Sequence, residues 1–435
     1  MVVASRENKR WGLGTIITSM SVWDIRFPTS ASLDGSDAMN VAPDYSMAYV
    51  RLDTNQPGLS GFGFTFTIGR GNDLCAAGIR SLRALVVGRS LDGITSAMGE
   101  FWRLLVGDSQ LRWLGPEKGV VHLAAAAVVN AVWDLWGKQE DKPVWRLAAD
   151  LSADHIVSLI DFTGITDAIA PGEAARLLKE REAGVTARRA QLLDEGFPAY
   201  TTSAGWLGYP DDKIRRLCAE AVEAGWRALK IKVGRDLEDD RRRCAIVRES
   251  IGPDRLLMID ANQVWEVEEA ISWTRAMAEF EPYWIEEPVH PDDVLGHARI
   301  RGEVAPIRVA TGEHVPNRIM FKQLLQADAI DVVQADACRL GGLNEAMAVM
   351  LLAAVHDKPI CPHAGGVGLC ENAQHLSMID YLRFGCSMEG RMARRLLRTL
   401  RRQRRRGDAG RSLQLRAARR ARGPRRDLRL PGGRA

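Results

Sequence analysis

The sequence lacks the features of a membrane or secreted protein. No apolar run reaches the length of a bilayer span, and the first twenty residues lack the charged start, apolar middle and cleavage site of a secretory signal. Its seven cysteines are scattered and odd in number, with no pair at metal-ligand or redox spacing, so we expect reduced thiols. These absences predict a cytoplasmic protein that contacts no membrane. What is present, 435 residues of which 46% are hydrophobic, suits an enzyme of one or two domains.

Charge is unevenly distributed along the chain. Residues 394–435 hold 17 arginines, no lysine and two acids, which gives +15; because the whole chain carries +4, residues 1–393 carry −11. Like charges at this density repel one another, so we expect the tail to be disordered. An arginine-rich tail could bind nucleic acid. This one has no aromatic residue to stack on bases and no recognisable binding module, which argues against that function.

Strand-like and helix-like segments alternate over residues 151–393. The strand candidates are IVSLIDF, RALKIKV, LLMIDAN, YWIEEP, IRVATGEH, VVQADA and PICPHA, with CSMEGR as a further candidate for an eighth. Between them, stretches such as NEAMAVMLLAAVH repeat apolar side chains at helical spacing. Strands separated by single helices predict parallel βα units.

Polar residues end six of these runs at intervals of 23 to 28 residues, about one βα unit each: Lys232, Asp260, Glu286, Glu313, Asp336 and His363. A (βα)8 barrel builds its site at the carboxyl ends of its strands, which is where these residues fall. We therefore predict a barrel over residues 151–393. Residues 1–150 contain three strand-like runs and the helical stretch HLAAAAVVNAVWDLWGK, and are expected to form a separate α+β domain over the barrel mouth.

Three carboxylates, those of Asp260, Glu286 and Glu313, close three successive strands. A single acid at a strand end is more often a solvated or salt-bridged loop residue. Three at one barrel mouth would repel one another unless a hard divalent cation neutralised them. We predict an Mg²⁺ site held by these residues.

Two lysines, Lys230 and Lys232, alternate onto one face of RALKIKV, where a buried ammonium group needs a partner. They could be snorkelling side chains at a strand end. Beside a dication and each other, their pKa values would instead fall toward the range of a general base. His363 alone could be a satisfied core histidine, but Asp336, one strand earlier, is placed to accept its ring proton. A lysine and a histidine would then flank the substrate.

The motifs KIK, IDAN, WIEEP, TGEH, QADACRLGG and PHAGGVGL, in this order and spacing, resemble the enolase superfamily, mandelate racemase branch. Other segments between residues 20 and 393, including RFPTSASLDGSDAMNVAPDYSMAYV and AYTTSAGWLGY, resemble its L-fuconate dehydratase group closely. The resemblance implies an α/β fold, a modified (βα)7β TIM-type barrel with an N-terminal α+β capping domain.

The resemblance also implies a reaction, the Mg²⁺-dependent dehydration of an acid sugar, L-fuconate, to a 2-keto-3-deoxy acid. Lys232 would abstract the proton α to the carboxylate, His363, held by Asp336, would protonate the departing 3-hydroxyl, and Lys230 would contact the carboxylate. The same residues would serve a dehydratase, racemase or epimerase for another acid sugar, and a homo-oligomer is compatible with the sequence. Cap positions that match substrate contacts are Gly35, Ser36, Asp37 and Tyr45, although DGSD by itself is merely a turn.

The resemblance ends at about residue 393. The family continues with a glutamate near the substrate, and counting on from His363 places it at position 394, where Arg394 stands. Glu389 is a displaced candidate for that role. The arginine-rich tail resembles a GC-rich gene translated in a shifted reading frame, so we expect this chain to be impaired.

Overall fold

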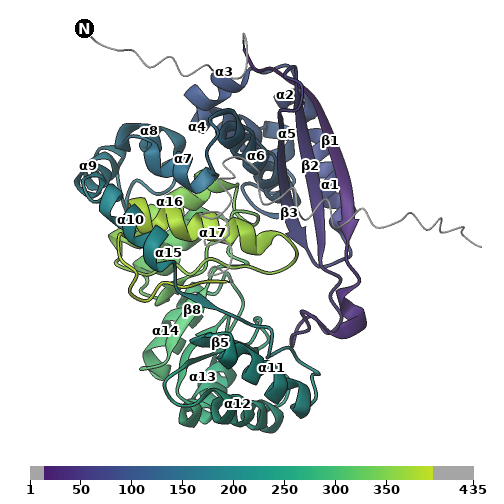
Figure 1. The fold of residues 1–435 in the computed structure, drawn as a ribbon, viewed down its shortest axis with the longest axis vertical. Helices are drawn as coiled ribbons and strands as arrows, with labels where there is room; N and C mark the ends of the chain where they lie inside the picture. Colours follow the sequence, from purple (N-terminus) through teal and green to yellow (C-terminus); the bar gives the residue numbers. More distant parts are fainter. Residues whose placement is uncertain (1–13, 395–435) are drawn as a thin grey trace, which may run out of the picture.

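A computed structural model describes residues 14–394 of the protein. The first part is an antiparallel sheet of order β1-β2-β3 with helices on one side (Figure 1). Each of the three strands overlaps one of the strand-like runs predicted from the sequence. The elements of this part are β1 (Ile17–Arg26), η1 (Thr29–Ser32), β2 (Ser46–Thr54), β3 (Ser60–Thr67), α1 (Asn72–Ser81), α2 (Arg83–Val86), α3 (Leu91–Ser96), α4 (Met98–Val106), α5 (Ser109–Arg112), α6 (Gly119–Gln139) and α7 (Val144–Asp150).

The long helix α6 lies between the antiparallel sheet and the rest of the molecule (Figure 1). By length and composition alone it could cross a membrane, so the expectation that no segment reaches spanning length is wrong. However, 83% of its most apolar 18-residue window is buried inside the fold. Two glycines of β3, Gly61 and Gly63, let the helix approach closely, since a Cβ at either would lie within 2.3 Å of a backbone carbonyl of α6. We interpret α6 as a core helix.

Strands and helices alternate from residue 199 onward, whereas the prediction placed the start of this alternation at residue 151. The elements of this part, after the helices α8 (Ala153–Leu159), α9 (Pro171–Glu182) and α10 (Val185–Glu195), are β4 (Ala199–Tyr200), α11 (Asp211–Glu223), β5 (Ala228–Lys232), α12 (Leu237–Ile251), β6 (Leu256–Asp260), α13 (Val267–Ala276), η2 (Ala278–Phe280), β7 (Pro282–Glu286), α14 (Val294–Val304), β8 (Arg308–Thr311), α15 (Arg318–Gln326), β9 (Val332–Val333), α16 (Leu343–Val355), α17 (Leu369–Ile379), η3 (Asp380–Phe384) and β10 (Ala393–Arg394).

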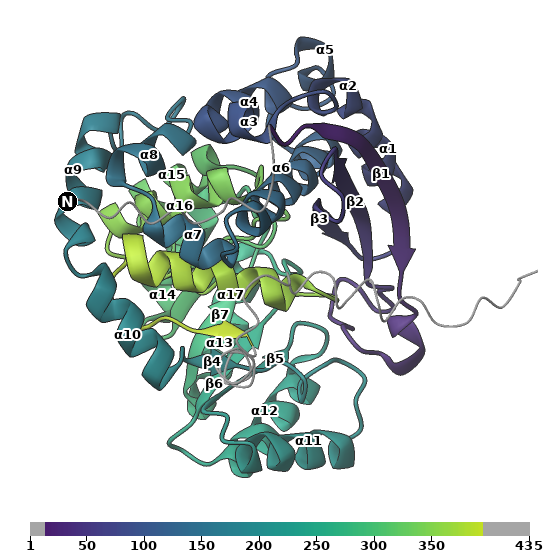
Figure 2. The same ribbon diagram turned by 45° about the horizontal axis from the view of Figure 1, so that its top comes forward.

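These strands form a closed barrel. Strands β5 to β9 pair in parallel in chain order, and single parallel bridges add β4 on one side, through Thr201, and the segment at Ile360 on the other. The last strand, β10, pairs in parallel with β4. The thiol of Cys361, next to Ile360, donates to the carbonyl of Gly390 and accepts from the N–H of Met392, which closes the ring. Seven βα units followed by β10 agree with the predicted (βα)7β barrel (Figure 2).

Two predicted strands are wrong. IVSLIDF lies mostly in helix α8, because the hydroxyl of Ser152 caps that helix by accepting from the N–H of His155. CSMEGR is not the eighth strand; β10 begins two residues after it. The exposed Glu389 therefore precedes the strand, and the adjacent Gly390 packs against Pro359, at the end of the barrel remote from the predicted site.

The backbone of Arg394 is the last part of the chain that the structure describes, and the rest of the predicted arginine-rich tail lies outside it. Arg394 pairs with Tyr200 at the carboxyl end of β10. The carboxyl ends of parallel barrel strands face one mouth, so position 394 belongs to the same edge as the predicted site.

Buried hydrogen bonds tie the antiparallel part to the barrel. Asn130 of α6 donates to the carbonyl of Ala337 over 2.9 Å, and Trp102 of α4 donates to the carbonyl of Gly341 over 2.6 Å. His122 of α6 lies 2.6 Å from the carboxylate of Glu345. These contacts fix the segment between β9 and α16, which carries Asp336.

Candidate active site

The strand register brings the predicted lysine and acids together. Lys232, Asp260 and Glu286 are the last residues of β5, β6 and β7, and they stand directly opposite one another in the ladder. Parallel neighbours in register project onto the same face, so their side chains converge on one edge. Glu313 follows two residues after β8, whose Ala310 pairs with Glu286. The regular spacing in the sequence thus corresponds to adjacency in space.

Asp260, Glu286 and Glu313 form a cluster in which one carboxylate oxygen from each lies within 4.8 Å of the others. Lys230 donates to Asp260 over 2.8 Å and also to Glu286, while Lys232 donates to Asp260 over 2.6 Å. Asp260 and Glu286 are fully buried. The place between these carboxylates therefore attracts positive charge, here from two ammonium groups.

Burial and mutual repulsion perturb the acids in different directions. Burial, reinforced by the charge of Asp260, raises the pKa of Glu286 to about 7. Burial also acts to raise the pKa of Asp260, but Lys230 and Lys232 outweigh it and lower that pKa. The raised pKa of Glu286 shows that the lysines do not fully offset the repulsion between this carboxylate and its acidic neighbours. Three carboxylate oxygen donors this close together suit a hard dication.

The pKa of Lys232 differs from the expected value. Burial acts to lower it, but the charge of Asp260 outweighs burial, and the pKa of Lys232 is raised. The expected decrease depended on a dication as the nearest charge, whereas here the nearest charge is a carboxylate. Lys232 also donates to Oδ1 of Asn262 over 2.7 Å, so its ammonium group is held at the barrel mouth.

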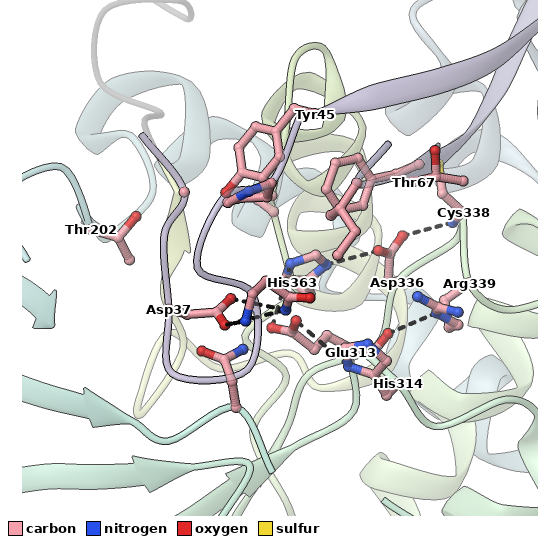
Figure 3. Close-up of a pocket in the computed structure, with 18 of the residues that line it drawn as sticks. Asp37, Tyr45, Thr67, Thr202, Glu313, His314, Asp336, Cys338, Arg339 and His363 are labelled. Carbon is pink, nitrogen blue, oxygen red and sulfur yellow. Dashed lines mark hydrogen bonds and ion pairs between the residues drawn. The ribbon is translucent and has the colours of Figure 1, made fainter. Parts of the chain in front are cut away.

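His363 and Asp336 form the predicted pair. Nδ1 of His363 lies 2.8 Å from Oδ2 of Asp336, and Nε2 lies 3.5 Å from Glu313 (Figure 3). Burial acts to lower the pKa of His363, but Glu313 and Asp336 outweigh it and the pKa is raised. The imidazolium form is therefore favoured, which suits a proton donor.

The loop between β1 and β2, residues 27–45, brings Gly35, Asp37 and Tyr45 to the barrel mouth. Gly35 has φ +91°, and a Cβ there would lie 2.5 Å from the Tyr45 ring, so only glycine fits beneath that ring. Ser36 does not line the cavity. Its hydroxyl donates to the carbonyl of Val41, and its carbonyl accepts from the N–H of Leu207, so its contacts are within the protein.

A cavity of about 200 Å³ lies between this loop and the barrel. Figure 3 shows Asp37, Glu313 and His363 around one space, with Tyr45 at the top and Asp336 beside His363. All the predicted catalytic and cap residues except Ser36 line it, whereas Asp260 and Glu286 lie beneath the two lysines. Residues that sequence reasoning did not assign also line it, namely Phe66, Ile68, Tyr200, Thr202, Trp206, Asn262, His314 and Arg339.

Two domain families match the chain. Residues 19–148 match the mandelate racemase / muconate lactonizing enzyme N-terminal domain, and residues 213–405 match the enolase C-terminal domain-like family. The L-galactonate dehydratase of Hypocrea jecorina is 54% identical over 371 residues, which cover 84% of this chain and 82% of that protein. The chain belongs to the enolase superfamily.

Solved structures agree with this assignment. The crystal structure of human mitochondrial enolase superfamily member 1 matches with a TM-score of 0.87 and 50% identity, covering 88% of each chain. A racemase from Streptomyces coelicolor A3(2), solved with bound magnesium, matches with a TM-score of 0.67 and 26% identity, covering 84% of this chain and 87% of that one. This enolase-superfamily chain therefore has a capping domain and a barrel-type domain, and its relatives include acid-sugar dehydratases and magnesium-binding enzymes.

Proposed function

We propose that this protein is an Mg²⁺-dependent dehydratase that converts L-fuconate to its 2-keto-3-deoxy acid. The observation that carries the proposal is the arrangement of Lys232 and His363. Both line one cavity, and both interact with the three-carboxylate cluster, Lys232 through Asp260 and His363 through Glu313. A general base and a general acid beside one cluster of carboxylates are what the elimination requires, because a proton leaves the carbon α to the carboxylate and a hydroxyl leaves the β carbon.

Asp260, Glu286 and Glu313 would hold the Mg²⁺ ion. When bound, the ion supplies positive charge for the substrate carboxylate and for the negative charge that develops there as the α-proton leaves. Lys230, already beside Asp260 and Glu286, would contact the same carboxylate. With the charge of Asp260 neutralised, the main cause of the raised pKa of Lys232 is removed, and the amine can act as a base.

The protein's own groups then move two protons. Lys232 takes the proton from C2, and His363 gives a proton to the 3-hydroxyl, which leaves as water. The product is an enol that tautomerises to the 2-keto-3-deoxy acid. Asp336 holds Nδ1 of His363, which leaves Nε2 beside Glu313 at the cavity, and it favours the imidazolium.

The choice of L-fuconate is supported by the motifs of the cap and by the apolar side of the cavity. L-Galactonate, named for the relative in Hypocrea jecorina, differs from L-fuconate only by a hydroxyl on C6. Phe66 and Ile68 line the cavity near the cap, where they suit a terminal methyl group better than a hydroxymethyl group. Both acids belong in a test.

The test is an incubation of the purified protein with Mg²⁺ and a panel of acid sugars, followed by an assay for 2-keto-3-deoxy acids. We expect L-fuconate to give product and L-galactonate to give less. If C2 epimers formed without any keto acid, the protein would be an epimerase. Salt-sensitive nucleic-acid binding lost on removal of residues 395–435, without turnover, would favour the binding alternative.

A further inference from the structure

One fully buried acid of the barrel mouth has no role in the proposed reaction. Glu287 follows Glu286, and its side chain is completely buried. Its carboxylate accepts from Nε2 of Gln263 over 2.8 Å and lies 3.0 Å from Nδ1 of His314. Burial of a carboxylate is unfavourable unless the group is partnered, so these two side chains stabilise it.

The backbone around this acid is strained. Asn262, Gln263 and Glu287 all have positive φ, at 48°, 67° and 46°. Left-handed backbone is uncommon at residues other than glycine, and it gathers at functional sites. Gln263 also donates its N–H to the carbonyl of Glu287, which ties the two strained segments together.

His314 connects this cluster to the cavity. Its side chain is 34% exposed and lines the cavity, while Glu287 is completely enclosed. Nδ1 makes the contacts with Glu287 and with Gln263. Within residues 14–394, Nε2 of His314 has no hydrogen-bond partner. In Figure 3, His314 lies below Glu313, at the opposite end of the view from Tyr45.

The pair His314–Glu287 therefore repeats the arrangement of His363–Asp336 on the other side of Glu313. Nε2 of His363 lies 3.5 Å from Glu313, and Nδ1 of His314 lies 3.7 Å from it. In both pairs a carboxylate holds Nδ1. The two pairs differ in the nitrogen that approaches Glu313, which is Nε2 in His363 and Nδ1 in His314, and the proposed reaction assigns a role to His363 alone.

The proposed function gives no protein partner to the substrate hydroxyls on C2, C4 and C5, and of these only the hydroxyls on C4 and C5 are absent from short 2-hydroxy acids. In the proposed function, Lys230 contacts the carboxylate, Lys232 the C2 proton and His363 the 3-hydroxyl. A hydroxyl can both donate and accept, so it can pair with Nε2 of His314 in either tautomer. We propose that His314, oriented by Glu287, binds a hydroxyl on C4 or C5 and thereby selects polyhydroxy acids over short 2-hydroxy acids. This inference rests on the proposed function.

The test uses two substitutions that keep different halves of the ring. His314→Gln retains a polar group near the position of Nε2, which faces the cavity, whereas His314→Asn retains one near Nδ1, which contacts Glu287. His290→Gln and His290→Asn, at an exposed position outside the cavity, are the matched controls. The probes are 3-deoxy-L-fuconate, which lacks the leaving hydroxyl but keeps those on C4 and C5, and glycolate, which has neither.

We expect His314→Asn to bind 3-deoxy-L-fuconate roughly tenfold more weakly than the parent in saturating Mg²⁺, and glycolate equally well. His314→Gln should stay within about threefold of the parent for both probes. If His314→Asn bound the probes as tightly as the parent and His314→Gln did not, the role of His314 would be structural. Equal losses for both probes, or weaker Mg²⁺ binding, would assign Glu287 and His314 to the metal site and overturn the inference. Failure of the parent to bind either probe would refute the proposed function instead.

Discussion

Lys232 donates a hydrogen bond to Oδ2 of Asp260 over 2.6 Å, between residues that stand directly opposite each other at the ends of β5 and β6. The same oxygen accepts from Lys230 over 2.8 Å. The ammonium group of the proposed base therefore pairs with the carboxylate of a proposed metal ligand. Binding of a cation to the cluster would change this pairing, so cation binding and the protonation of Lys232 are linked.

Glu286→Gln should weaken Mg²⁺ binding at least tenfold, because it replaces one of three charged oxygen donors. The side chain lies at a strand end, so the melting temperature without Mg²⁺ should stay close to that of the parent. Calorimetric titration with Mg²⁺ measures the first effect and thermal unfolding the second. Glu389→Gln, at an exposed position, is the control. Unchanged Mg²⁺ affinity in Glu286→Gln would refute the metal site.

Arg394→Glu should raise the rate of dehydration. Position 394 lies at the carboxyl end of β10 beside Tyr200, and an acid there would restore the charge that the family resemblance implies. Arg398→Glu makes the same change of charge outside the described residues and should leave the rate near that of the parent. Equal rates for Arg394→Glu and the parent would mean that an arginine at this position does not impair the enzyme.

Glu345→Gln should destabilise the protein at neutral pH. Glu345 accepts from the N–H groups of Arg318 and Gly341 and from the Arg318 guanidinium, and it contacts His122. Burial acts to raise its pKa, but His122 and Arg318 outweigh it and lower the pKa to about 2. A lowered pKa stabilises the fold above the ordinary value near 4.5, and this contribution is lost as the pH falls from 4.5 toward 2.

The size of this effect follows from the shift. A decrease of roughly two units corresponds to about 3 kcal/mol at pH 7. The free energy of unfolding of the parent and of Glu345→Gln, measured between pH 7 and pH 3, should therefore converge on acidification. A constant difference across this range would show that the ionised carboxylate is not what stabilises the junction of cap and barrel.

Much of the site was predictable because the strand ends that carry the site residues of a barrel recur at regular intervals along the chain. Each βα unit brings one strand end to the same mouth, so residues spaced by 23 to 28 positions had to converge. The short strand β10 was misplaced, since its two residues leave no alternation in the sequence. Ser36 was assigned with its neighbours, yet its hydroxyl turns toward Val41, and only the folded loop shows this.

The pair Glu287–His314 was missed for a different reason. WIEEP and TGEH both belong to the family resemblance, and the metal-binding role that it implies falls on Glu286 of the first motif and Glu313 of the second. The pairing depends on side chains from two different strand ends meeting at 3.0 Å, and no periodicity in the sequence encodes that contact. The signal in the sequence that could have indicated this pair is the second polar residue directly after each proposed metal ligand, Glu287 after Glu286 and His314 after Glu313.

In the proposed reaction, Lys232 removes the C2 proton and His363 acts afterwards on the 3-hydroxyl. The exchange of the C2 proton of L-fuconate with solvent deuterium, followed by NMR in saturating Mg²⁺ for the parent, Lys232→Ala and His363→Asn, tests this order most directly. We predict that Lys232→Ala lowers exchange by 10²- to 10⁴-fold, the usual contribution of a general base, whereas His363→Asn retains exchange but forms no keto acid. Exchange within about tenfold of the parent in Lys232→Ala, or its loss in His363→Asn alone, would contradict the assignment.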